Sequence, residues 1–183
     1  MNATDPRVTF AELQRWPDDG RRYELYDGEV IVVPSPFPRH QRVKLHLAEI
    51  LVEYERAHGG VLFDAPIDIV FDEHNVIQPD VVYFREERRD VVEDWEPTRA
   101  APDLAVEVLS RSTEARDRGR KMQLLARFGV QEYWIVDPAK NTLEIYVRRA
   151  GAYELMVDTG EDETITSPTF PHLAFSTTRV FAS

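Results

Sequence analysis

Asp103-Leu104-Ala105-Val106-Glu107-Val108-Leu109 predicts the central strand of a β-sheet. Side chains alternate along a strand, so Leu104, Val106 and Val108 share one face, and Ala105, Glu107 and Leu109 share the other. Two apolar faces are typical of a strand that is buried on both sides. A carboxylate in such a place must be paired or neutralised, so Glu107 needs a cation or a proton. A buried ion pair with an arginine, or escape of the side chain to solvent at the strand edge, would also meet this need.

A helix is predicted over residues 114–128, directly after this strand. One stripe of it, at i, i+4, i+7, i+8 and i+11, carries Asp117, Lys121, Leu124, Leu125 and Phe128. Lys121 is therefore expected to point toward the sheet, where a helix returning over the strand can bring its ammonium near Glu107. Two alternatives stay open, because the lysine can extend to solvent or pair with Asp117 one turn earlier.

Pro79-Asp80 opens a further predicted strand, Val81-Val82-Tyr83-Phe84. Proline is tolerated at the first position of a strand. The pair Pro-Asp also occurs at Pro17-Asp18 and Pro102-Asp103, so it is a weak signal alone. Only Asp80 leads into one strand and precedes a second strand with an internal glutamate. The carboxylates of Asp80 and Glu107 are therefore predicted on neighbouring strands, on the same side of the sheet.

The rest of the chain alternates between helical and extended patterns without an internal repeat. A helix over residues 39–58 should end at Gly59-Gly60. Thr9-Phe10-Ala11-Glu12 has capping-box spacing for a short helix, and Asp27-Gly28 suits the turn of a hairpin. The other strands are predicted at residues 61–64, 67–71, 132–136, 143–147 and 153–158, with a surface loop at 85–98 and a turn-rich tail at 164–183. This order predicts an α/β domain with helices packed on a mixed sheet.

The composition narrows the class of protein. The chain has 183 residues, which fits one domain: a core over about 39–137, an N-terminal hairpin at 21–34 and C-terminal strands at 143–180. It has no cysteine, which excludes disulfide scaffolds and thiolate sites. Residues 1–9 lack a signal-peptide pattern and no apolar run is long enough to cross a bilayer, so a soluble cytoplasmic protein is expected. The net charge of -11 argues against a generally basic nucleic-acid-binding surface, and the basic run between Arg111 and Lys121 can be a solvated helix face.

Several of these motifs occur together in a known family. Gln78-Pro79-Asp80, Glu107-Val108-Leu109-Ser110, the Asp117 to Lys121 segment and Glu132-Tyr133-Trp134-Ile135-Val136-Asp137 resemble a bacterial family of putative restriction endonucleases within the PD-(D/E)xK nuclease superfamily. The hairpin around Asp27-Gly28 and the segment from Pro34 to Gln41 are similar to that family's N-terminal portion. The resemblance covers roughly residues 9–175. It implies a restriction-endonuclease-like αβββαβ core, with the N-terminal hairpin and the C-terminal strands as additions.

The resemblance also implies a site. Asp80 and Glu107 would bind Mg²⁺ or Mn²⁺ through hard oxygen ligands. The lysine expected two residues after the glutamate is Leu109 here, and the resemblance suggests that Lys121 takes its place. Glu24, His40, Gln78 and Asp117 are candidates for an outer shell. The implied activity is metal-dependent hydrolysis of DNA phosphodiester bonds by a homodimer.

Two other classes of function remain open. A nuclease fold without catalysis, kept for nucleic-acid binding, would suit the acidic net charge and the missing strand lysine. A structural or regulatory dimer would bind no nucleic acid at all. Metal binding separates the nuclease from the structural dimer, and DNA binding without cleavage identifies the inactive binding module. Nucleotide hydrolysis and serine-esterase chemistry are disfavoured, because the sequence has neither a phosphate-binding glycine loop nor a Gly-x-Ser-x-Gly motif.

Overall fold

A computed structural model describes residues 7–182, and its centre is a six-stranded mixed sheet. The strand order is β10-β9-β8-β7-β6-β3, in which β7 and β8 run parallel and all other neighbours run antiparallel. The strands are β3 (Val61–Asp64), β6 (Val81–Phe84), β7 (Leu104–Val108), β8 (Glu132–Asp137), β9 (Thr142–Arg149) and β10 (Ala152–Thr159). The predicted mixed sheet is confirmed, and β7 is buried on both faces as its sequence indicates.

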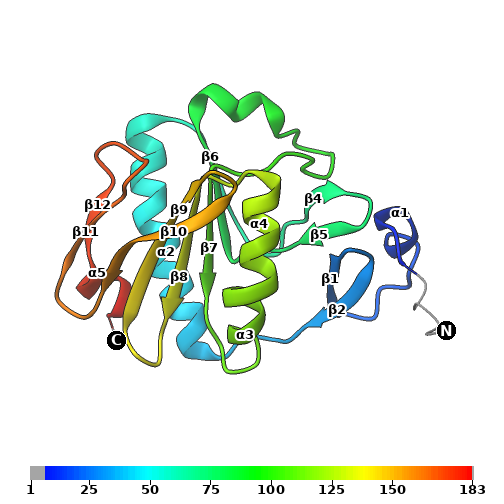
Figure 1. The fold of residues 1–183 in the computed structure, drawn as a ribbon, viewed down its shortest axis with the longest axis horizontal. Helices are drawn as coiled ribbons and strands as arrows, with labels where there is room; N and C mark the ends of the chain where they lie inside the picture. The colour runs from blue at the N-terminus through cyan, green and yellow to red at the C-terminus, as the bar shows by residue number, and fades with distance from the viewer. Residues whose placement is uncertain (1–6, 183) are drawn as a thin grey trace.

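Helices cover both faces of this sheet (Figure 1). The long helix α2 (Pro38–His58) lies on one face. The other face carries a helix in three parts: α3 (Glu114–Arg116), a π-helical turn η2 (Asp117–Lys121) and α4 (Met122–Phe128). The chain order α2-β3-β6-β7-α4-β8 reproduces the expected αβββαβ core.

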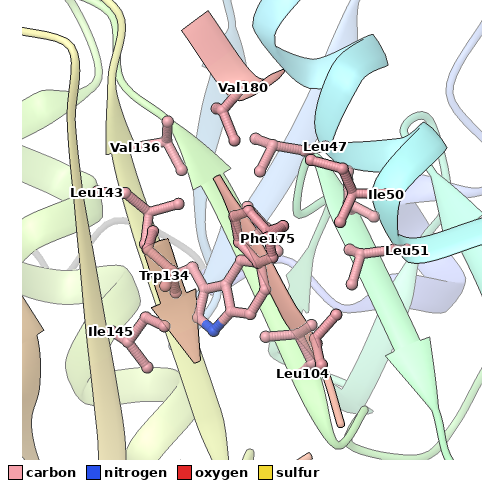
Figure 2. Close-up of a cluster of buried hydrophobic side chains, with 14 of the residues drawn as sticks. Leu47, Ile50, Leu51, Leu104, Trp134, Val136, Leu143, Ile145, Phe175 and Val180 are labelled. Carbon is pink, nitrogen blue, oxygen red and sulfur yellow. The ribbon is translucent and has the colours of Figure 1, made fainter. Parts of the chain in front are cut away.

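The larger apolar core fills the space between α2 and the sheet (Figure 2). Leu47, Ile50 and Leu51 of α2 face Leu104 of β7 and Trp134 of β8, all at most 4% exposed. The second core lies under α4 and includes Leu124, Leu125, Val82, Ala105 and Ile135. Glu107 shares this second face of β7, so its carboxylate points toward the helix that carries Lys121.

A second, four-stranded sheet has the order β2-β1-β5-β4. Its strands are β1 (Arg22–Tyr26), β2 (Glu29–Val33), β4 (Ile69–Asp72) and β5 (Asn75–Ile77). Asp27 and Gly28 have φ angles of 50° and 83°, which confirms the predicted hairpin turn. The pairing of Leu25 with Val76 joins the hairpin to β5. Residues 67–71 were predicted as a strand of a single mixed sheet, whereas β4 belongs to this second sheet. Residues 75–77 were not predicted as a strand, because three residues are too few for an alternation pattern to emerge.

Other segments refine the predicted order. The capping box at Thr9 begins α1 (Phe10–Leu13), as expected. The predicted loop at 85–98 contains a 3₁₀ helix, η1 (Glu86–Val91), and the tail forms β11 (Thr164–Thr166), β12 (Ala174–Ser176) and α5 (Thr177–Phe181). The predictions for the first six residues lie outside the described part of the chain. Among residues 7–182, no helix is both long and apolar enough to span a bilayer.

Candidate active site

Asp80 and Glu107 lie opposite each other on adjacent strands. The antiparallel register pairs Val81 with Val106, so one step further out it brings Asp80 across from Glu107. Side chains directly opposite in an antiparallel pair point to the same face. Asp80 Oδ2 also accepts a hydrogen bond from the backbone N–H of Val108 at 2.9 Å, which fixes this carboxylate against the end of β7. The two carboxylates therefore share one side of the sheet.

Lys121 reaches the same place from η2. Its Nζ donates a hydrogen bond to Glu107 Oε1 at 2.7 Å and lies 2.8 Å from Glu24 Oε1. The side chain is almost completely buried. No ion pair joins Lys121 to Asp117 among residues 7–182, so neither the solvent-exposed position nor the pairing with Asp117 describes this lysine.

Glu24 is the partner of Lys121 that sequence reasoning placed only in an outer shell. It lies in the middle of β1 and is fully buried. Its carboxylate accepts hydrogen bonds from the hydroxyl of Tyr26 and from the backbone N–H of Gln78, both at 2.9 Å. Glu24 is thus held rigidly and in turn fixes the ammonium of Lys121. A glutamate among apolar residues of a hairpin strand is the one sequence signal that pointed to it.

The remaining candidates surround this centre at different distances. His40 Nε2 lies 3.2 Å from Asp80 Oδ2, and the side chain of Gln78 donates to Asp68 rather than to the centre. Asp117 is buried, but its carboxylate accepts no hydrogen bond within the described residues, and Arg116 Nε lies 3.6 Å away. Arg116 Nε also lies 3.7 Å from Glu24 Oε2. The view of residues 111–121 as a solvated basic face is therefore wrong for Arg116 and Lys121.

Asp80, Glu107 and Lys121 line one cavity with a volume of about 40 Å³. A single water needs roughly 10–15 Å³ on this measure, so the cavity can hold an ion with a few waters. Neither Glu24 nor Asp117 reaches the wall of the cavity. The other lining residues are Arg22, Val33, Pro34, Ser35, Pro36, Phe37, His40, Gln78, Val108, Ser110, Ser112, Thr113 and Arg116.

Burial and mutual repulsion set the charges in this centre. Burial, and then the negative charges of Asp117, Asp80 and Glu24, raise the pKa of Glu107 well above its usual value despite Lys121. Burial opposes the charge on Lys121, but Glu107 and Glu24 outweigh it and raise the lysine pKa well above normal. Burial also acts against Asp80, yet hydrogen bonding to His40 and to Val108 lowers its pKa. Asp80 is therefore ionised, whereas Glu107 holds a proton or needs a cation.

The donor set fits a hard divalent cation. Asp80 Oδ1 and Glu107 Oε2 accept no hydrogen bond from residues 7–182, and both residues face the cavity. Four carboxylates (Glu24, Asp80, Glu107 and Asp117) gather around two permanent cations (Arg116 and Lys121), which would leave two negative charges unbalanced if all four were ionised and His40 were neutral. Carboxylate oxygens are the ligands that Mg²⁺ and Mn²⁺ prefer. Within the described chain no cluster of three or more His, Cys, Asp or Glu side chains has metal-binding geometry, so waters and backbone oxygens would complete such a site.

A family model matches the part of the chain that contains the fold and these side chains. The model for Uma2, described as putative restriction endonuclease, matches residues 10–178. The chain belongs to the Uma2 family. The match spans both sheets, the cavity and all of the candidate residues, so this Uma2 protein is nuclease-like over nearly its whole length.

Two relatives extend this comparison. The Uma2 chain is 26% identical over 150 residues to the uncharacterized protein slr1290 of Synechocystis sp., covering 79% of this chain and 76% of that one. Its fold matches the crystal structure of a putative nuclease belonging to DUF820 from Anabaena variabilis, with a TM-score of 0.79 at 21% identity. That match covers 95% of this chain and 97% of the other, so the two share the whole fold.

The raised pKa of Glu107 predicts how the metal-free protein responds to pH. In the unfolded chain a glutamate loses its proton near pH 4.3. Above that pH the folded state still holds the proton, so Glu107 lowers the free energy of unfolding increasingly as the pH rises. Glu107→Gln removes this penalty, so in chelator the variant should gain melting temperature relative to wild type as the pH rises above about 4.3.

Thermal unfolding at several pH values, followed by circular dichroism, measures this difference. Each unit by which the folded pKa exceeds the unfolded one corresponds to about 1.4 kcal/mol. Glu154→Gln on the exposed surface of β10 is the matched control and should show no such trend. A constant difference between Glu107→Gln and wild type across this pH range would contradict the prediction.

Proposed function

We propose that this Uma2 protein is a Mg²⁺- or Mn²⁺-dependent endonuclease that hydrolyses phosphodiester bonds of DNA, and that it acts in the cytoplasm. The observation that carries the proposal is the buried contact between Lys121 and Glu107 beside Asp80. Leu109 occupies the strand position where the superfamily pattern has lysine. The ammonium of Lys121, which comes from η2, contacts Glu107 and would take over the function of that missing strand lysine.

Asp80 and Glu107 are the residues that would hold the metal ion. A divalent ion bound there would polarise the phosphate and lower the pKa of a coordinated water. Asp80 is kept ionised by its hydrogen bonds, and Glu107 becomes ionised when a cation replaces its proton. The free oxygens Asp80 Oδ1 and Glu107 Oε2 are the atoms that this role requires.

Lys121 is suited to stabilise charge that develops on the phosphate. A lysine ammonium has three donors, and its contacts with Glu107 and Glu24 account for two. The third has no acceptor among residues 7–182 and is available on the cavity side. Glu24 positions the ammonium, because it is itself held by Tyr26 and Gln78. A donor fixed in advance by a buried partner is what electrostatic stabilisation of a transition state requires.

The net charge of the chain is acidic, but the residues that line the candidate site are not mainly acidic. A second cavity adjoins the first and shares Phe37, His40 and Ser110 with it. The charged residues lining the two are six basic ones (Arg22, Arg39, Arg111, Arg116, Lys121 and Lys140) and four acidic ones (Asp80, Glu107, Glu114 and Asp137). The walls of the two cavities thus carry two more basic than acidic residues, although the chain carries a net charge of -11 and the carboxylates of Glu24 and Asp117 lie buried behind Lys121 and Arg116. Local potential, rather than total charge, attracts a phosphate backbone.

Cleavage of supercoiled plasmid DNA tests the proposal. Wild-type protein with Mg²⁺ or Mn²⁺ should convert the plasmid to nicked and linear forms, and chelator should prevent this. Asp80→Asn keeps the size of the side chain but removes its charge, and should abolish cleavage. Wild-type protein that binds DNA with these metals present but never cuts it would instead identify a non-catalytic binding module.

A homodimer is proposed as the assembled form. Leu155 and Met156 of β10 are 50% and 41% exposed, and β10 is an edge strand of the main sheet. Val32 on the edge strand β2 is 48% exposed. Burial of such apolar side chains against a second copy would remove them from water. Two sites in one assembly also suit cutting both strands of a duplex.

Light scattering coupled to size exclusion should return the mass of a dimer at micromolar concentration. Leu155→Lys should shift the mass toward the monomer. Glu154→Lys, a neighbour with its own half-exposed side chain, is the control and should leave the mass unchanged. A monomer mass for the wild-type protein would overturn this proposal without affecting the metal site.

A further inference from the structure

The second cavity has no part in holding a metal, yet it opens beside the carboxylates. Its volume is about 570 Å³, within the range of about 300–1,000 Å³ that is usual for ligand sites. It shares Phe37, His40 and Ser110 with the first cavity, so a polymeric ligand bound at the carboxylates would extend into the second cavity. We call this second cavity the side groove. Its exposed lining is mostly apolar, with Leu109, Pro138 and Ala139 contributing.

Phe37 stands at the border between the two cavities. Phe37 is 74% exposed, and every other phenylalanine among residues 7–182 is buried or partly buried. It precedes the first turn of α2 and lies between Pro36 and Pro38, which restrict the backbone on both sides. A large apolar ring held in water by a stiff segment contributes nothing to the core. It offers a flat face for a planar ligand.

Arg111 supplies a positive charge at the wall of the side groove. Its guanidinium has no acidic partner within 4 Å among residues 7–182, whereas Lys140 of the same wall lies 3.0 Å from Asp137. Arg39 is also engaged, because it donates to the carbonyl groups of Phe181 and Ala182. Arg111 is therefore the basic side chain of the side groove that is most available to an anion.

The metal-binding carboxylates are recessed, which limits what can reach them. The side chains of Asp80 and Glu107 are only 14% and 6% exposed. A single strand is more flexible than a duplex, whose persistence length is about 50 nm, so its backbone enters such a recess more readily. Stacking on aromatic rings, combined with basic groups along the backbone, is how proteins bind unpaired strands. Phe37 and Arg111 provide this combination next to the carboxylates.

We propose that the side groove binds an unpaired nucleotide adjacent to the scissile phosphate, with its base stacked on Phe37 and its phosphate contacted by Arg111. This inference rests on the proposed function and gives it a substrate class: a single strand, or a duplex with an unpaired segment. A fully paired duplex binds more weakly, because its bases are already stacked within the helix.

Binding is measured separately from cleavage. Fluorescence anisotropy with a short labelled oligodeoxynucleotide, its RNA equivalent and the matching DNA duplex, all in chelator, gives the dissociation constants. Phe37→Ala should weaken binding of the single strand by about 5- to 150-fold, the range seen for loss of one stacked base, and leave the duplex nearly unchanged. Quenching of 2-aminopurine placed in the single strand should be lost in the same variant, which a purely structural role of Phe37 would not produce. The DNA and RNA arms show which sugar the side groove accepts.

Trp95 is the matched control for Phe37. It is 94% exposed and lies in the loop after η1, which follows the end of β6 away from Asp80. Trp95→Ala should change neither dissociation constant. Arg111→Gln should reduce the slope of the logarithm of affinity against the logarithm of salt concentration by about 0.7, as expected for one lost phosphate contact on a single strand.

The outcomes separate this inference from the proposed function. Unchanged single-strand affinity in Phe37→Ala, or an equal loss for the duplex, would overturn the nucleotide site even if plasmid cleavage is observed. Loss of single-strand binding and of quenching in Phe37→Ala supports the nucleotide site even if no cleavage is found. In that second case the endonuclease proposal fails, and the proposal that the side groove binds an unpaired nucleotide stands.

Discussion

Lys121→Ala is expected to destabilise the protein by about 3–5 kcal/mol and to abolish DNA cleavage. The stability loss follows because Glu24 and Glu107 would be left buried without their shared cation, and breaking a buried ion pair costs this much. A lysine that merely paired with Asp117 on a helix surface would contribute only about 0.2–0.5 kcal/mol. Removal of a single donor to a developing negative charge lowers the catalytic rate by about 10²- to 10³-fold. Urea unfolding and plasmid cleavage measure the two effects.

A double variant separates catalysis from folding. Glu24→Gln/Lys121→Met removes one buried carboxylate together with the ammonium, and methionine fills most of the volume of the lysine chain. Most of the lost stability should return, because the charge of Glu24 is removed with that of Lys121 and Glu107 can stay protonated. Cleavage should remain absent, whereas binding of Mn²⁺ should be retained or slightly stronger, since a neighbouring positive charge has been removed. Cleavage at the wild-type rate by this double variant would exclude Lys121 from the reaction.

The main sheet and the central strand follow from local signals. Alternation along residues 103–109 predicts both the burial of β7 and the face on which Glu107 lies. The Asp-Gly turn and the capping box at Thr9 are equally local, since each depends on a few neighbouring residues. The inward direction of Lys121 was also predictable, because it shares a helical stripe with Leu124 and Leu125.

The partners of Lys121 depend on contacts between distant segments. Glu24 precedes Lys121 by almost a hundred residues, and tertiary contacts such as the pairing of β1 with β5 bring the two side chains together. No periodicity reports such a contact. The π-helical turn at η2 is also invisible to the helical pattern, because the spacing of Asp117 and Lys121 is compatible with either kind of turn. Arg116 was placed in solvent for the same reason, since its burial comes from the hairpin above it.

Glu107→Ala is expected to remove metal binding and cleavage together. Glu107 Oε2 is one of two carboxylate oxygens in the cavity, with Asp80 Oδ1, that accept no hydrogen bond from residues 7–182, so Asp80 alone would hold the ion poorly. Isothermal titration calorimetry with Mn²⁺ should show strong binding to wild type and none to the variant at the same concentration. Lys121 keeps Glu24 as a partner, so Glu107→Ala should unfold with higher stability than Lys121→Ala.

The control for this variant lies on the same sheet. Glu144 of β9 is paired with Arg118 at 2.6 Å and lies outside the cavity, so Glu144→Ala should lose stability but keep both metal binding and cleavage. The contrast between Lys121→Ala, which binds metal without cutting, and Glu107→Ala, which does neither, assigns the two residues to different tasks. Mn²⁺ binding that survives in Glu107→Ala would place the ion elsewhere and contradict the assignment of Asp80 and Glu107. Cleavage that survives in Glu107→Ala would refute the proposed role of Glu107 in the reaction.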